Sequence, residues 1–112
     1  MDGKLPFEIL ASGTDAGLVK FQLDLGSVAV AGHDPLKVME KYTGRLFSIH
    51  AKEVKDGQIG LALGEGTLDW KVLFAAAKKQ GLMNYAVETG ARADVVWDKL
   101  QKSIEYLKAM KG

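Results

Sequence analysis

Residues 19–24 read VKFQLD, and their apolar and polar side chains alternate with a period of two. Such alternation predicts a β-strand with two unlike faces. Residues 46–51 (LFSIHA) and 84–88 (NYAVE) repeat the pattern. In the second stretch it assigns Phe47 to the apolar face and His50 to the opposite one. We therefore expect three strands, each with one apolar face and one polar or small face.

Segments of helical period lie before, between and after these strands. Residues 34–44 open with the Asp-Pro pair that commonly caps and starts a helix, and they end at a glycine. In the next helix, which ends at Gly81, either Thr67 or Asp69 can be the cap, and a short helical segment covers 7–11. The last helix is expected over 93–110. Its apolar stripe includes Trp97, which we therefore place in the core.

The resulting order of elements, α-β-α-β-α-β-α, separates each strand from the next by a helix-length connection. Connections of this kind join parallel strands through right-handed crossovers. A doubly wound sheet buries both of its faces, whereas the polar or small face predicted here suits the inner wall of a barrel. The expected fold class is α/β: a partial (half) TIM barrel of about three parallel strands with flanking helices. We expect a single domain over residues 1–112.

Charge and composition narrow the classes of function. The 112 residues include 15 Lys plus Arg and 14 Asp plus Glu, for a formal net charge of +1. Nucleic acid and membrane surfaces are therefore not expected partners. The absence of cysteine excludes disulfides, thiolate metal sites and cysteine nucleophiles. The sequence shows neither a signal-peptide pattern nor a membrane-spanning run, so we expect a soluble, cytoplasmic protein.

A different metal-ligating side chain ends the polar face of each predicted strand: Asp24, His50 and Glu88. The carboxyl ends of parallel strands lie at one edge of a sheet, which is where α/β barrels place their sites. Two carboxylates and an imidazole suit Mn²⁺, Mg²⁺, Co²⁺ or Zn²⁺ better than a soft metal. The alternative interpretation is a solvated polar face on which His50 only hydrogen-bonds a neighbour. The pattern thus indicates a candidate divalent-metal site.

Four segments carry a resemblance to a known family. They are LVKFQLDLGSVAVAGHDP (18–35), YTGRLFSIHAKEV (42–54), LGEGTLDW (63–70) and YAVETG (85–90). Their order and spacing make the chain, from about residue 5 to 110, similar to the C-terminal part of the sugar phosphate isomerases/epimerases, which are xylose-isomerase-like TIM barrels. The resemblance implies that Asp24, His50 and Glu88 descend from metal ligands on strands six, seven and eight of that barrel.

The family moves a proton between neighbouring carbons of a sugar through an enediolate. A metal stabilises the developing charge, and two carboxylates transfer the proton. By resemblance, Glu88 is both a ligand and one of these catalytic carboxylates, while the other comes from a strand four that is absent from this sequence. Lys52, in the HAKE form (50–53) of an H-x-K-D motif, is expected to bind a substrate phosphate or hydroxyl, or else to be a solvated lysine. Ser27 stands where the family often has a substrate-binding histidine.

Three strands do not close a TIM barrel, which usually has eight strands and about 250 residues. Open sheet edges and an exposed barrel interior are aggregation hazards, so we expect the chain to associate with itself, most simply as a homodimer. Two functional classes follow. One is a divalent-metal-dependent isomerase or epimerase that receives its second carboxylate from another chain. The other is a catalytically silent half-barrel that self-associates and keeps at most a vestigial metal site.

Overall fold

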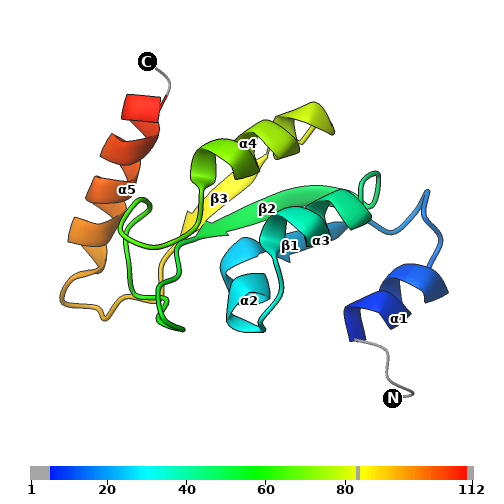
Figure 1. The fold of residues 1–112 in the computed structure, drawn as a ribbon, viewed down its shortest axis with the longest axis horizontal. Helices are drawn as coiled ribbons and strands as arrows, with labels where there is room; N and C mark the ends of the chain where they lie inside the picture. Colours follow the sequence, from blue (N-terminus) through cyan, green and yellow to red (C-terminus); the bar gives the residue numbers. More distant parts are fainter. Residues whose placement is uncertain (1–5, 83, 111–112) are drawn as a thin grey trace.

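The computed structural model describes residues 6–82 and 84–110, and within them three strands form one parallel sheet (Figure 1). The strands β1 (Phe21–Asp24), β2 (Leu46–Lys52) and β3 (Tyr85–Glu88) lie in the order β1-β2-β3, and both pairings are parallel. The expected parallel sheet is therefore confirmed. The helices are α1 (Pro6–Gly13), α2 (Leu25–Val30), α3 (Pro35–Lys41), α4 (Trp70–Lys79) and α5 (Val96–Met110). Within the described ranges, none of them is long and apolar enough to cross a membrane.

Side-chain caps explain where α3 and α4 begin. Asp34 accepts a hydrogen bond from the Leu36 N–H at 2.9 Å, and Pro35 follows it as the first residue of α3. Asp69 accepts one from the Val72 N–H at 3.2 Å and so caps α4. Each cap satisfies a backbone donor that the helix itself leaves unpaired. The predicted start of α3 is confirmed, and of the two caps predicted for the next helix, Thr67 and Asp69, it is Asp69 that begins α4.

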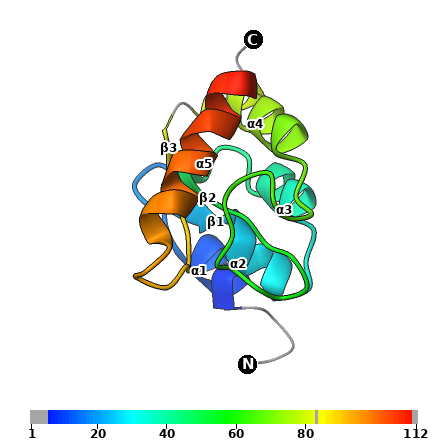
Figure 2. The same cartoon turned by 90° about the vertical axis from the view of Figure 1, so that its left-hand side faces the viewer.

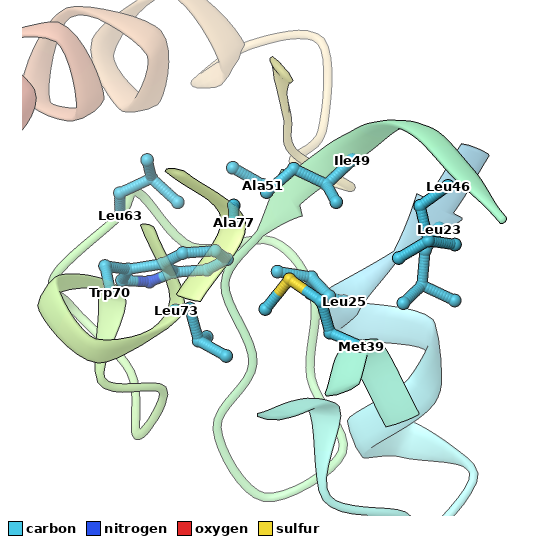
Figure 3. Packing of buried hydrophobic residues seen from close by; sticks show 10 residues of the cluster. All are labelled: Leu23, Leu25, Met39, Leu46, Ile49, Ala51, Leu63, Trp70, Leu73 and Ala77. Carbon is cyan, nitrogen blue, oxygen red and sulfur yellow. The ribbon is translucent and has the colours of Figure 1, made fainter. Parts of the chain in front are cut away.

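The apolar face of the sheet is covered by α3 and α4, which lie on the same side of it (Figures 1 and 2). Trp70, at the start of α4, is 0 % exposed and lies among Leu63, Leu73 and Ala77 (Figure 3). The rest of the buried cluster comes from the strands and the first helices: Leu23, Leu25, Met39, Leu46, Ile49 and Ala51. On the opposite face, here called the open face, Gln22 and Ala86 are exposed, although Ser48 between them is buried. A sheet covered on one face only is what a segment of a β/α barrel presents.

An irregularity in β2 changes which side chains reach the core. Phe21 pairs with Leu46, whereas the next residue, Gln22, pairs with Ser48, so β2 has one residue more than β1 at this point. A β-bulge of this kind interrupts the alternation of side chains. Leu46 therefore lies in the core and is 8 % exposed, while Phe47 is 63 % exposed and lines a hollow with Gln22 on the open face. The prediction that Phe47 lies on the apolar face is wrong.

Helix α5 packs through a different face from the one its apolar stripe predicts. It begins at Val96, and Trp97 is 79 % exposed, so the placement of Trp97 in the core is wrong. The fully buried side chain of α5 is Ser103, at 1 % exposure. Its hydroxyl accepts a hydrogen bond from the Leu63 N–H at 3.0 Å and donates one to the Lys99 carbonyl at 2.8 Å. Tyr106, Leu107 and Met110 also pack against the hydrophobic cluster, so Leu107 of the predicted stripe does face the core. Together these contacts hold α5 in place and leave Trp97 exposed.

Candidate metal centre

The three strands bring four charged or ionisable side chains to one edge of the sheet. In the β1–β2 pairing Asp24 lies opposite His50, and in the β2–β3 pairing Lys52 lies opposite Glu88. Because the strands are parallel, their carboxyl ends meet at the same edge, and residues two apart on β2 point to the same face. The sheet register therefore places all four side chains on the open face.

Asp24, His50 and Glu88 converge as the strand phase predicts. One ligand atom from each lies within 4.8 Å of the others. His50 Nδ1 is 2.8 Å from Glu88 Oε2 and 3.6 Å from Asp24 Oδ2. The Asp24 side chain is 21 % exposed and that of Glu88 43 %, so the cluster is half-buried but open to solvent on the side of β3. These atoms offer one nitrogen and two carboxylate donors to a small cation.

Lys52 belongs to the same cluster. Its Nζ lies 3.0 Å from Asp24 Oδ2 and 3.3 Å from Glu88 Oε1, and its side chain is 11 % exposed. Burial acts to lower the pKa of Lys52, but the hydrogen bonds and charges of Asp24 and Glu88 outweigh burial, so this pKa lies above its usual value. Lys52 is thus a charged, partner-bound ammonium and not a solvated lysine at a strand end.

Asp24 is held by the helix that follows it. It is the N-cap of α2, and its Oδ1 accepts a hydrogen bond from the Ser27 N–H at 2.9 Å. Burial acts to raise the pKa of Asp24, but the hydrogen bonds from Ser27 and the charge of Lys52 together hold it below its usual value. Ser27, predicted to contact substrate, therefore has a visible role in orienting Asp24. Its side chain is exposed beside a groove of about 520 Å³ that Asp24 also lines.

Glu53, the last residue of the HAKE motif, points away from the open face into the loop between β2 and α4. It is 0 % exposed. Its two oxygens accept four hydrogen bonds, from the N–H groups of Val54 (3.0 Å), Gly64 (2.9 Å) and Leu68 (3.2 Å) and from the indole N–H of Trp70 (2.7 Å). Glu53 thus fastens the loop to the end of β2, directly after Lys52.

Sequence reasoning missed part of this arrangement. Helix α2 was not predicted, although Asp24, which caps it, is one of the residue types that commonly begin a helix. The four hydrogen bonds that Glu53 accepts could not be predicted from a local sequence pattern, because the donors lie up to 17 positions away in the chain. The pairing of Lys52 with both carboxylates follows from the same strand phase that selected His50, since residues 50 and 52 share a face.

The fold is an α/β unit of parallel strands whose ionisable side chains gather at the carboxyl edge. It is similar to a sugar phosphate isomerase/epimerase from Parabacteroides distasonis ATCC 8503, with a TM-score of 0.81 and 26% identity over 92% of this chain and 34% of that one. A second sugar phosphate isomerase/epimerase structure from the same organism matches with a TM-score of 0.79 and 22% identity, over 94% of this chain and 36% of that one. No family model matches the chain, and neither does any curated protein.

These comparisons confirm the resemblance to the sugar phosphate isomerases/epimerases and the partial TIM-barrel-like fold. The chain spans about a third of the length of the solved structures it matches. Completion of the barrel by oligomerisation stays a prediction, as does the cytoplasmic location.

Proposed function

We propose that this chain contributes the metal-binding edge of a divalent-metal-dependent sugar (phosphate) isomerase or epimerase. The observation that carries the proposal is the convergence of Asp24, His50 and Glu88, from three different strands, within 4.8 Å. The similarity in fold to sugar phosphate isomerases/epimerases supports the same class of reaction. The cytoplasm, where sugar phosphates are plentiful, remains the proposed location.

The donor set fits a hard or borderline divalent cation. Two carboxylates supply negative charge and an imidazole supplies one nitrogen, which suits Mn²⁺, Mg²⁺, Co²⁺ or Zn²⁺. When bound, such an ion would polarise the oxygens of a sugar and stabilise charge that develops on them. Asp24 is prepared for this role because Ser27 fixes one of its oxygens and leaves Oδ2 facing the cluster.

Glu88 is the residue of this chain that we assign to proton transfer. Its carboxylate is 43 % exposed, more than that of Asp24, so it is accessible to a substrate on the open face. His50 Nδ1, 2.8 Å away, orients it. We assign substrate contacts to Lys52, which carries a positive charge suited to a phosphate or hydroxyl, and to the exposed Ser27 beside the groove. A second acid–base carboxylate would come from another segment or another chain.

A second candidate is a catalytically silent half-barrel that self-associates and keeps a vestigial metal site. The ion pairs of Lys52 favour this candidate, because they neutralise part of the cluster without any metal. The exposed Phe47 on the open face favours association with a second copy, since burying a large apolar side chain stabilises a dimer. In this case the open faces of two copies would cover each other.

Metal analysis followed by an activity screen separates the two candidates. The purified chain is assayed for bound metal and then, with Mn²⁺ or Co²⁺ added, for interconversion of ketose and aldose phosphates. The enzyme candidate predicts turnover that Glu88→Gln abolishes and that the matched control Glu40→Gln, at an exposed position of α3, leaves unchanged. Absence of both metal and turnover in the wild-type chain would instead favour the silent half-barrel.

A further inference from the structure

The ammonium of Lys52 contacts Asp24 and Glu88, which are two of the three candidate metal ligands. Asp24 Oδ2 is 3.6 Å from His50 Nδ1 and 3.0 Å from Lys52 Nζ, so the oxygen that faces the imidazole also contacts the ammonium. Glu88 is shared in the same way, with Oε2 against His50 and Oε1 against Lys52. The two carboxylates therefore already hold a positive charge between them.

The side chain of Lys52 is fixed in this place by its surroundings. It is 11 % exposed, and its stem packs on Gly26 in the first turn of α2. A Cβ at Gly26 would lie 2.8 Å from Lys52 Cβ and 2.9 Å from Lys52 Cγ, closer than atoms of real side chains approach. Glycine at position 26 thus makes the space that the lysine stem fills, and the ammonium is aimed at the carboxylates by a packed stem.

A divalent cation and this ammonium cannot bind the same carboxylates at the same distances without strong repulsion. Two like charges a few ångströms apart in a half-buried site repel each other far more than they would in water. A cation on Asp24 Oδ2 would also compete with Lys52 for the lone pairs of that oxygen, which faces both His50 and Lys52. Metal binding is therefore expected to weaken at least one of the two ion pairs of Lys52.

We propose that Lys52 is a built-in competitor of the metal, whose ammonium occupies Asp24 and Glu88 in the metal-free protein and sets the metal affinity of the centre. The inference rests on the proposed metal centre and adds a residue that tunes it. In the metal-free state Lys52 keeps the two carboxylates together, and with metal bound it is released from them. The centre consequently binds its metal weakly and exchangeably.

The test measures the affinity of Mn²⁺, added as the chloride, for three single variants by titration calorimetry. Lys52→Met removes the charge and keeps the length of the stem, Lys52→Arg keeps the charge, and Lys71→Met removes the same charge from an exposed position of α4. We expect Lys52→Met to bind Mn²⁺ at least about tenfold more tightly than wild type, and Lys71→Met to change the affinity by less than about twofold. Lys52→Arg should not bind more tightly than wild type. Combining Lys52→Met with Asp24→Asn should abolish the gain.

The outcomes distinguish this inference from the proposed function. Wild type and Lys52→Met binding Mn²⁺ equally well, or Lys52→Met binding it less well, would overturn the role of Lys52 and leave the metal centre standing. No binding by either protein would overturn both. Tighter binding by Lys52→Met than by wild type supports the inference, whereas a wild-type chain that binds Mn²⁺ but isomerises no sugar would count against the enzyme alone.

A second measurement on the unmodified chain covers the case in which Lys52→Met does not fold. Side-chain ammonium groups held in ion pairs give observable ¹H–¹⁵N signals, and the signal of Lys52 can be followed while Zn²⁺ is added. We expect that signal to shift or disappear in proportion to the Zn²⁺ bound, while the ammonium of Lys41, paired with Glu8 in another part of the fold, stays unchanged. A Lys52 signal that is unaltered at saturating Zn²⁺ would overturn the proposal.

Discussion

Replacing Glu53 with glutamine is expected to destabilise the protein strongly, although the change is nearly isosteric. Each carboxylate oxygen of Glu53 accepts two hydrogen bonds: Oε1 from Val54 and Leu68, and Oε2 from Gly64 and Trp70. A glutamine can present only one oxygen. Whichever way its amide turns, two N–H groups of the protein face an NH₂ group and lose their acceptor.

The magnitude follows from the number of donors left unpaired. A buried donor without an acceptor costs about 1–3 kcal/mol, so two of them cost about 2–6 kcal/mol. Domains of this size are stable by about 5–15 kcal/mol, so the variant is expected to be marginal or unfolded. Glu53→Asp keeps both oxygens but shortens the side chain. Glu53→Asp should therefore lose the more distant hydrogen-bond partners, and its free energy of unfolding should lie between those of Glu53→Gln and wild type.

Urea unfolding followed by tryptophan fluorescence measures the effect, because Trp70 is buried beside Glu53 and reports its release. The control is Glu40→Gln, which removes the same charge from an exposed position. It should change the free energy of unfolding by less than about 0.5 kcal/mol. The reasoning would be refuted by a Glu53→Gln variant whose free energy of unfolding is within about 0.5 kcal/mol of wild type.

Three further predictions concern other parts of the fold. Gly26→Ala should lower the free energy of unfolding, measured by urea unfolding, by about 1–3 kcal/mol, because the added Cβ would lie 2.6 Å from a carbonyl oxygen of β2. The control Gly13→Ala should have little effect, because a Cβ at Gly13 would meet nothing within 4 Å. Hydrogen bonds from the Ala62 N–H and from Lys99 hold the pKa of Glu65 below its usual value of 4.5. The ionised carboxylate therefore stabilises the fold above about pH 4.5, and this stabilisation is lost as the pH falls through the pKa of Glu65 in the folded protein. Glu65→Gln should therefore cost about 1 kcal/mol at pH 7 and nothing near pH 2, and an equal difference at both pH values would contradict this. Light scattering after size exclusion should show a dimer that Phe47→Gln weakens, whereas a wild-type monomer at micromolar concentration would contradict the proposed association.

The parallel sheet and the convergence of the candidate ligands were predictable from the sequence for a physical reason. Alternation with a period of two fixes the face on which a side chain lies, and helix-length connections make the strands parallel. These two rules are enough to bring Asp24, His50 and Glu88 to one edge. Local capping signals were equally readable, as Asp34 and Asp69 show.

The features that could not be predicted depend on contacts between distant segments. The β-bulge that exposes Phe47 arises from the pairing of β2 with β1, and the alternation within β2 alone gives no sign of it. Trp97 is exposed because α5 faces the fold with the side that carries Ser103, Tyr106 and Met110, and the partner of Ser103, Leu63, lies 40 positions earlier in the chain. The burial of Glu53 likewise depends on a loop that closes around it.

We propose Asp24, His50 and Glu88 as the ligands of a divalent-metal centre. Crystals grown or soaked with Mn²⁺ and measured for anomalous scattering test it most directly. We expect one strong anomalous peak at about 2.2 Å from a donor atom of each of the three side chains, with the Lys52 ammonium moved away. A map at saturating Mn²⁺ with no peak among these side chains, and with Lys52 still bridging Asp24 and Glu88, would contradict it.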